Sequence, residues 1–132
     1  GTLLNVRRII IDMTQNTDKK TILIVEDDPF IAMDLEDTFT NHGYHVIGPC
    51  ADVDTGLRLL KDTRPDVAML DYNLGRETSI PLAQTLDEQR VPYVFLSGQV
   101  QHVVTGHDLP QRPVIAKPFV PEQLVVVIEN LI

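Results

Sequence analysis

The chain has 132 residues, of which 43% are hydrophobic and 23% are charged, and its formal net charge is −8. This length fits one domain of ordinary size, and the composition is that of a globular protein rather than a disordered or fibrous one. A single cysteine, Cys50, excludes an internal disulfide framework and a cysteine-based zinc site, and it favours a reducing, cytoplasmic compartment. The longest purely apolar run, residues 124–128, is far too short to span a bilayer, so no membrane insertion is expected.

The charge is unevenly distributed along the chain. Residues 1–20 carry four basic and two acidic side chains, whereas the remaining 112 residues carry a net charge of −10. An acidic globular part repels phosphate backbones, so direct binding to nucleic acid is not expected. Acidic side chains gathered at one place would instead favour a hard divalent cation.

Residues 1–20 are interpreted as an N-terminal extension to a domain that occupies residues 21–132. One reading is an upstream or vector-derived segment, with Met13 as the natural start. The other is a short amphipathic helix, because apolar residues recur at three- and four-residue spacing from Leu3. Such a helix would dock a partner or a second copy of the chain, so a homodimer is an alternative to a monomer.

From Thr21 onward, short apolar runs alternate with segments of helical periodicity. Each run is bounded by turn residues, and Gly48-Pro49 closes the second one. Such short runs are typical of strands that are buried on both faces of a sheet. The expected strands are residues 22–25, 44–47, 67–70, 91–96 and 114–116.

Four segments between and after these strands carry helical signals. Asp28 followed by Pro29 is typical of an N-cap with proline at the first helical position. Residues 99–110 contain few good helix formers, so a helix there would be short or unformed. Strands that alternate with helices through short connections predict an α/β fold, with a parallel sheet and helices on both faces. The expected helices run from Pro29 to Gly43, from Asp52 or Asp54 to Pro65, through residues 82–86, and over residues 121–131.

Polar side chains follow the predicted strands at the edge of the sheet where ligands of parallel α/β folds bind. Glu26 and Asp27 follow the first strand, and Asp71 follows the third. Ser97 and Lys117 follow the fourth and fifth strands. Mg²⁺ would remove the repulsion between the carboxylates, while the lysine and the hydroxyl would hold the oxygens of an incoming anion. These groups together predict phosphoryl transfer to Asp71.

Each of these residues also has a simpler structural interpretation. An aspartate pair before a helix usually caps it, Asp71 can be a turn residue, and Lys117-Pro118 can be a surface turn. We favour the functional interpretation because all of the groups occur at the correct strand ends and in the correct order. Cys50 is expected to be a small buried hydrophobic residue rather than a reactive thiol.

Three segments resemble the receiver domain of bacterial two-component response regulators. They are Thr-Ile-Leu-Ile-Val-Glu-Asp-Asp-Pro at residues 21–29, Pro-Asp-Val-Ala-Met-Leu-Asp-Tyr-Asn-Leu-Gly at residues 65–75, and Lys-Pro-Phe at residues 117–119. The resemblance covers residues 21–132. It implies a flavodoxin-like (βα)5 three-layer sandwich whose five-stranded parallel sheet has the strand order 2-1-3-4-5.

The resemblance also implies the roles of the acidic residues. Asp71 would accept a phosphoryl group from a sensor histidine kinase or a His-containing phosphotransfer protein. Mg²⁺ would be bound directly by Asp27 and Asp71, through water by Glu26, and by the backbone carbonyl of Asn73. The protein would be a conformational switch that binds a downstream protein. It would assist its own phosphorylation and dephosphorylation without being an enzyme in the usual sense.

Two further residues receive roles from the same resemblance. Lys117 would contact the phosphoryl group, and Ser97 would turn toward it after transfer, with residues 98–112 rearranging around it. The peptide bond between Lys117 and Pro118 would be cis.

The sequence departs from the receiver pattern at two places. Receivers usually have Tyr or Phe three residues before the lysine, where this chain has Val114, so signalling by rotation of an aromatic ring is not expected here. Residues 94–98 are similar to the Phe-Ala-Thr-Gly motif of a single-domain receiver subgroup, but Leu96 and Ser97 replace its Ala and Thr.

Two other functions are alternatives to the phosphoacceptor. A magnesium-dependent phosphohydrolase of the haloacid dehalogenase type needs a second acid two residues after its nucleophile, and here that position is Asn73. A receiver that is not phosphorylated would act only as a binding module. The complete set of acidic, hydroxyl and lysine side chains argues against that interpretation.

Overall fold

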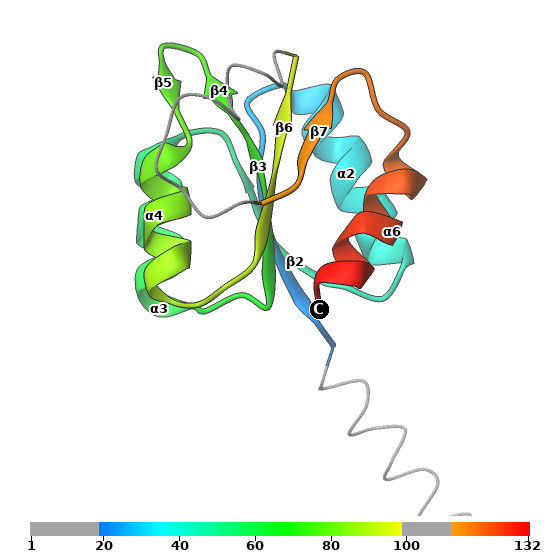
Figure 1. Cartoon of the computed structure of the whole chain (residues 1–132), viewed down its shortest axis with the longest axis horizontal. Coiled ribbons are helices and arrows are strands. Elements are labelled where there is room, and N and C mark those ends of the chain that lie inside the picture. Colours follow the sequence, from blue (N-terminus) through cyan, green and yellow to red (C-terminus); the bar gives the residue numbers. More distant parts are fainter. Residues whose placement is uncertain (1–18, 99–111) are drawn as a thin grey trace, which may run out of the picture.

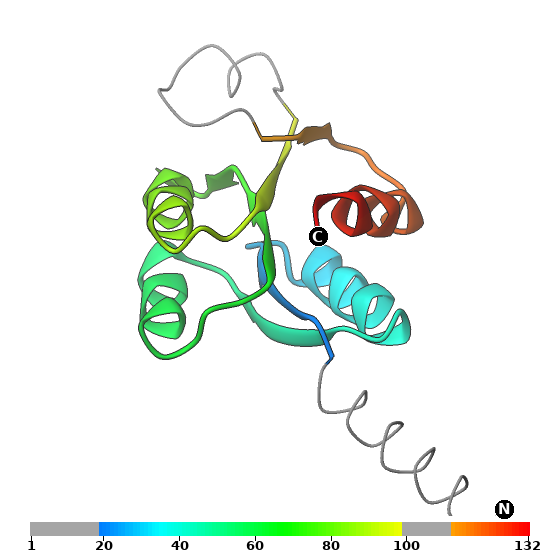
Figure 2. The ribbon, with the colours of Figure 1, turned by 60° about the horizontal axis from the view of Figure 1, so that its bottom comes forward.

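The computed structural model describes residues 19–98 and 112–132, in which a five-stranded parallel sheet lies between two layers of helices. Helices α3 and α4 cover one face of the sheet, and α2 and α6 cover the other (Figures 1 and 2). The sheet has the order β2-β1-β3-β6-β7, which is the predicted order when its five strands are counted along the chain. Its elements are β1 (Thr21–Val25), α2 (Pro29–Asn41), β2 (His45–Cys50), α3 (Val53–Asp62), β3 (Val67–Asp71), α4 (Ile80–Glu88), β6 (Tyr93–Ser97), β7 (Val114–Ala116) and α6 (Pro121–Leu131).

The three inner strands, β1, β3 and β6, contribute apolar side chains to both faces, and the sheet therefore divides the core into two clusters. Leu23 and Val25 of β1 face the α3–α4 side, whereas Ile22 and Ile24 face the α2–α6 side. All four side chains are completely buried. Since successive side chains of a strand point to opposite faces, a continuous apolar run is what a strand covered on both sides requires.

The starts of α2 and α3 follow from local capping by side chains. The Asp28 side chain accepts hydrogen bonds from the backbone N–H groups of Phe30 and Ile31, at 2.9 and 3.2 Å, and starts α2. Of the two predicted caps of α3, Asp52 is the one used, because its side chain accepts from Thr55 N at 2.7 Å. These bonds satisfy N–H groups that have no partner within the helix.

The second strand is longer than predicted, because Gly48-Pro49 lies inside β2 and does not close it. Leu23 pairs with Ile47 and Val25 pairs with Cys50, so β2 contains one extra residue at a bulge. Gly48 has a φ of +91°, and a Cβ there would lie 2.8 Å from Cys50 N. The strand continues because β2 is an edge strand, where proline is tolerated, and because glycine can adopt the backbone of the bulge.

Other strand boundaries differ by one or two residues from those predicted. β3 and β6 each extend one residue further, so that they include Asp71 and Ser97. β6 begins at Tyr93, because the N–H of Val91 donates to the carbonyl of Leu86 at 2.9 Å and so belongs to the end of α4. Cys50 is buried in the α3–α4 side of the core, which confirms the expected hydrophobic role.

A two-stranded antiparallel ribbon was not predicted. It consists of β4 (Asn73–Leu74) and β5 (Glu77–Thr78), with the turn at Gly75, and it follows β3 directly. The predictions for residues 1–18 and 99–110 lie outside the described residues. Within the described ranges, no helix combines the length and the apolarity that crossing a bilayer requires.

Replacing Gly48 with alanine is expected to destabilise the fold more than the same change at Gly43. Both glycines have positive φ, +91° and +87°, so each substitution carries a backbone cost of about 1–2 kcal/mol. At Gly48 the new Cβ would also lie 3.0 Å from Ile24 O, whereas at Gly43 nothing lies within 4 Å. Urea denaturation of both variants measures the two losses, and equal losses would contradict the packing argument.

Candidate functional site

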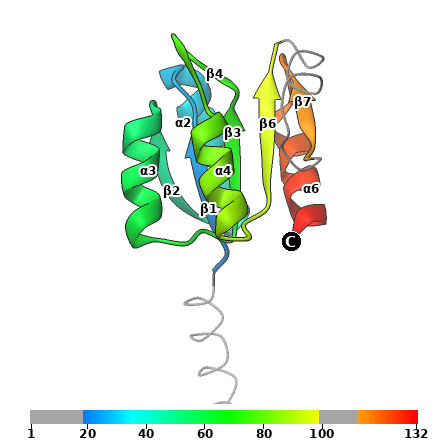
Figure 3. The ribbon, with the colours of Figure 1, turned by 60° about the vertical axis from the view of Figure 1, so that its left-hand side comes forward.

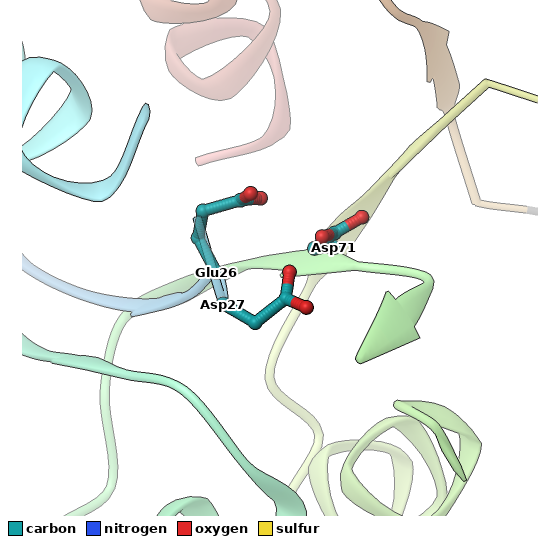
Figure 4. A group of neighbouring side chains, drawn as sticks. All are labelled: Glu26, Asp27 and Asp71. Carbon is teal, nitrogen blue, oxygen red and sulfur yellow. The ribbon is translucent and has the colours of Figure 1, made fainter. Parts of the chain in front are cut away.

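Three carboxylates converge where β1 and β3 end. Glu26 and Asp27 follow β1, and Asp71 is the last residue of β3, the neighbouring strand. Figure 4 shows the three side chains extending from these strand ends into the same space. One oxygen of each lies within 4.8 Å of the others. The predicted meeting of these acids therefore occurs, because adjacent parallel strands end at the same edge of the sheet.

Lys117 follows the edge strand β7 and brings a positive charge to these carboxylates. Its Nζ lies 3.2 Å from Asp71 Oδ1 and 3.4 Å from each carboxylate oxygen of Glu26. Its backbone N–H donates to the carbonyl of Ser97 at 2.9 Å, which fixes the residue at the end of β7. The peptide bond between Lys117 and Pro118 is cis, as predicted.

Burial makes it costly for the carboxylates of this cluster to carry charge. Glu26 and Asp71 are only 2% and 4% exposed, and Asp27 is exposed. Burial, followed by the nearby charge of Glu26, raises the pKa of Asp71 to about 7, although Lys117 acts in the opposite direction. Burial alone would lower the pKa of Lys117, but the charges of Asp71 and Glu26 together outweigh it and raise that pKa.

The chemistry of the donor set fits a hard divalent cation. Three carboxylates lie close together with one ammonium group that contacts two of them, and the acids line a cavity of about 460 Å³ together with Asn73 and Lys117. Oxygen-only ligands that leave space for water are those that Mg²⁺ prefers. A cation here would also offset the repulsion that raises the pKa of Asp71.

The remaining predicted residues take different positions around this cavity. Asp28 lines it, but the same side chain caps α2. Asn73 is exposed on its wall at the start of β4. Ser97 is 1% exposed at the end of β6, and the next residue, Gly98, lines the cavity.

Comparison with known proteins identifies the family to which this domain belongs. Residues 22–129 match the response regulator receiver domain. The chain belongs to the response regulator receiver family. Glu26, Asp27, Asp71 and Lys117 all lie within the matched residues.

Individual relatives agree with this assignment. The receiver is 31% identical over 106 residues to an uncharacterized response regulatory protein of Vibrio vulnificus, covering 79% of this chain and 44% of that protein. It is 31% identical over 115 residues to the phyllosphere-induced regulator PhyR of Methylorubrum extorquens, covering 83% of this chain and 42% of PhyR. The chain thus spans less than half the length of these two proteins.

A solved structure of similar length also resembles this receiver in fold and sequence. The solution structure of SdrG from Sphingomonas melonis Fr1 is 36% identical, with a TM-score of 0.72. The likeness covers 86% of this receiver and 96% of that chain. The assignment to the Phe-Ala-Thr-Gly subgroup is still a prediction from residues 94–98.

One residue of this region was missed by the sequence reasoning. Glu77, in β5, accepts a hydrogen bond from the backbone N–H of Val53 at the start of α3, 2.9 Å away. The partners are separated by 24 residues, so no local pattern links them. The sequence does contain one signal for the β4–β5 ribbon. Gly75 lies between two short segments, which is typical of a tight turn between paired strands.

Asp71→Asn is expected to raise the unfolding temperature of the metal-free receiver at pH 8, by an amount that shrinks toward pH 5. The pKa of Asp71 is about 7 in the fold and 3.8 as a free side chain. Between these values the folded state binds a proton that the unfolded state does not, so wild-type stability falls as the pH rises through this range. Asparagine has nearly the same shape and does not titrate.

Scanning calorimetry in EDTA from pH 5 to pH 8 measures this difference. Glu88→Gln, which removes an exposed carboxylate at the far end of α4, serves as the control. A gain for Asp71→Asn that stays constant with pH would contradict the electrostatic explanation.

Proposed function

We propose that this receiver accepts a phosphoryl group on Asp71 with the help of Mg²⁺ and acts as a conformational switch in two-component or phosphorelay signalling. The observation that carries the proposal is the position of Lys117 Nζ, 3.2 Å from Asp71 Oδ1, beside the acids Glu26 and Asp27. The groups that would serve as nucleophile, metal ligands and cation for the phosphoryl oxygens thus lie within one site. Phosphoryl transfer depends on this kind of positioning and charge.

The chemical step follows from the positions of the side chains. A carboxylate oxygen of Asp71 attacks phosphorus, and the bond between phosphorus and the donor histidine nitrogen breaks. The electron pair of that bond stays on the imidazole, which then takes up a proton. The ammonium group of Lys117 is placed to hold the negative charge on the phosphoryl oxygens.

Mg²⁺ would be held by the carboxylates of Asp27 and Asp71, by Glu26 through water, and by the backbone carbonyl of Asn73. When bound, it neutralises charge on the acids and on the phosphoryl oxygens. Asp71 is the group that would react, and its salt bridge with Lys117 holds the carboxylate in place against the repulsion of Glu26. The backbone N–H of Tyr72, which donates to Leu96 O at 2.9 Å, helps to fix that orientation.

The switch would use Ser97 and the chain that follows it. Ser97 directly follows Leu96, which pairs with Asp71 between β3 and β6, and its carbonyl accepts a hydrogen bond from the N–H of Lys117. Val114 lies opposite Phe95 and is partly buried. Because this residue is a valine, the position has no aromatic ring that could rotate. We therefore propose that movement of Ser97 toward the phosphoryl group is transmitted through the backbone between β6 and β7.

The proposed partners are a sensor histidine kinase or a His-containing phosphotransfer protein as donor, and a downstream protein that recognises the switched surface. A second copy of the chain is an alternative partner.

We place the protein in the cytoplasm, without direct binding to nucleic acid or insertion into a membrane. It is a phosphoacceptor that assists its own phosphorylation and dephosphorylation rather than an enzyme with a separate substrate. A phosphohydrolase is disfavoured because Asn73 has a neutral amide where that reaction needs an acid.

Incubation with acetyl phosphate and Mg²⁺ is expected to increase the intact mass of the protein by one phosphoryl group. Asp71→Asn and addition of EDTA should each abolish the increase. Asp28→Asn is the matched control, because asparagine also caps helices well and this acid serves α2 rather than the reaction. No increase with acetyl phosphate or with a panel of phosphorylated histidine donors would contradict the proposal and favour the binding-module alternative.

Mg²⁺ is expected to raise the unfolding temperature of the wild type, and Asp27→Asn should lose most of that shift. A cation that binds only the folded state stabilises it in proportion to its occupancy. Asp27 offers an exposed carboxylate oxygen to the cluster, so its replacement removes a ligand with little change in packing. Thermal unfolding with increasing Mg²⁺ measures the effect, and an undiminished shift would show that Asp27 is not a ligand.

A further inference from the structure

The ribbon β4–β5 carries the Asn73 backbone at the rim of the acidic site. Asn73 pairs with Thr78, and Leu74 pairs with Glu77. The base of this loop is fixed, because Tyr72 N donates to the sheet and Ser79 N donates to Tyr72 O at 3.0 Å. Residues 73–78 therefore extend from a rigid base past the end of β3, at the same end of the sheet as the end of β6 (Figure 3).

Two contacts hold the projecting ribbon against the body of the domain. Leu74 is 5% exposed and packs in the α3–α4 side of the core, which also contains Val53. On the paired strand, Glu77 Oε1 accepts from Val53 N at 2.9 Å. One strand of the ribbon is thus held by packing and the other by a hydrogen bond.

The bond to Glu77 uses a donor that the helix itself leaves without a partner. Val53 is the first residue of α3, and the Asp52 cap accepts from Thr55 N instead. The first N–H groups of a helix have no carbonyl partner within it, and a negative charge there is favourable. The hydrogen bond from Val53 N and the favourable charge at the helix start therefore both stabilise Glu77 at this position.

We propose that Glu77 is a positioning residue that ties the ribbon to α3 and thereby fixes the Asn73 backbone for Mg²⁺ binding, an inference that rests on the proposed function. Without the Glu77 bond, Leu74 would still pack and the base of the ribbon would stay closed, but the strand that pairs with Asn73 would lose its contact with α3. The Asn73 carbonyl would then be held less firmly at the rim of the site. Groups that orient metal ligands affect affinity by about 10-fold or more.

The test compares the dissociation constant of Mg²⁺ in four variants, measured by isothermal titration calorimetry. Glu77→Ala is expected to weaken binding about 10-fold, whereas Glu77→Gln retains an acceptor oxygen and should bind nearly as tightly as the wild type. Val53→Pro removes the donor itself at a helix position where proline is well tolerated, so it should weaken binding like Glu77→Ala. Asp52→Ala is the matched control, because it removes the other bond to the start of α3 without touching the ribbon.

The results separate positioning from simple stabilisation of α3. Asp52→Ala should lower the unfolding temperature and leave Mg²⁺ affinity unchanged, while both Glu77→Ala and Val53→Pro should lower the affinity. Wild-type affinity in Glu77→Ala or in Val53→Pro, or an equal loss in Asp52→Ala, would overturn the inference, as would absence of Mg²⁺ binding by the wild type. A wild type that binds Mg²⁺ but accepts no phosphoryl group would contradict the proposed function alone, since the affinities still decide the role of Glu77.

Discussion

The ammonium group of Lys117 is the contact on which the acidic site depends. The fold buries Glu26 and Asp71 close to each other, and two buried carboxylates repel strongly. Lys117 lies within 3.4 Å of both, and its long side chain crosses the end of β6 to reach them. A compact charge on a flexible four-carbon stem suits this bridging position. Since Asp27 adds a third carboxylate, the bridge leaves an excess of negative charge that a cation can balance.

The sheet places these groups by backbone bonds rather than by side-chain packing alone. Asp71 pairs with Leu96, and Ser97 pairs with Ala116, the residue before Lys117. The end of each strand is therefore fixed relative to its neighbour, and so are the backbones of Asp71, Ser97 and Lys117. Groups that are held in place before a reaction begins avoid the cost of being ordered during it. The Asn73 backbone lies outside this frame, and the proposed attachment through Glu77 would fix it there.

The same frame limits how the domain can change state. β3 is buried along its whole length, so a change at Asp71 is more easily taken up at the sheet edge than in its centre. β7 is short and only partly buried, and it carries Val114 where many receivers have an aromatic ring. Without a ring to rotate, the backbone bond between Lys117 and Ser97 is the direct connection from the site to this edge. The output of this receiver is therefore expected to depend on main-chain movement.

The sequence by itself determined the elements and the order of the chemistry along the chain. Buried strands appear as unbroken apolar runs, and the Asp28 and Asp52 caps act within three residues, so both signals are local. The acids Glu26, Asp27 and Asp71 could be placed at one edge because parallel strands end together. Only the tertiary structure decided that β2 runs through Gly48-Pro49, because the bulge depends on pairing with β1. It also decided that Lys117 bridges two acids and that Glu77 meets Val53, since those contacts join residues that are distant in the chain and have no local signature.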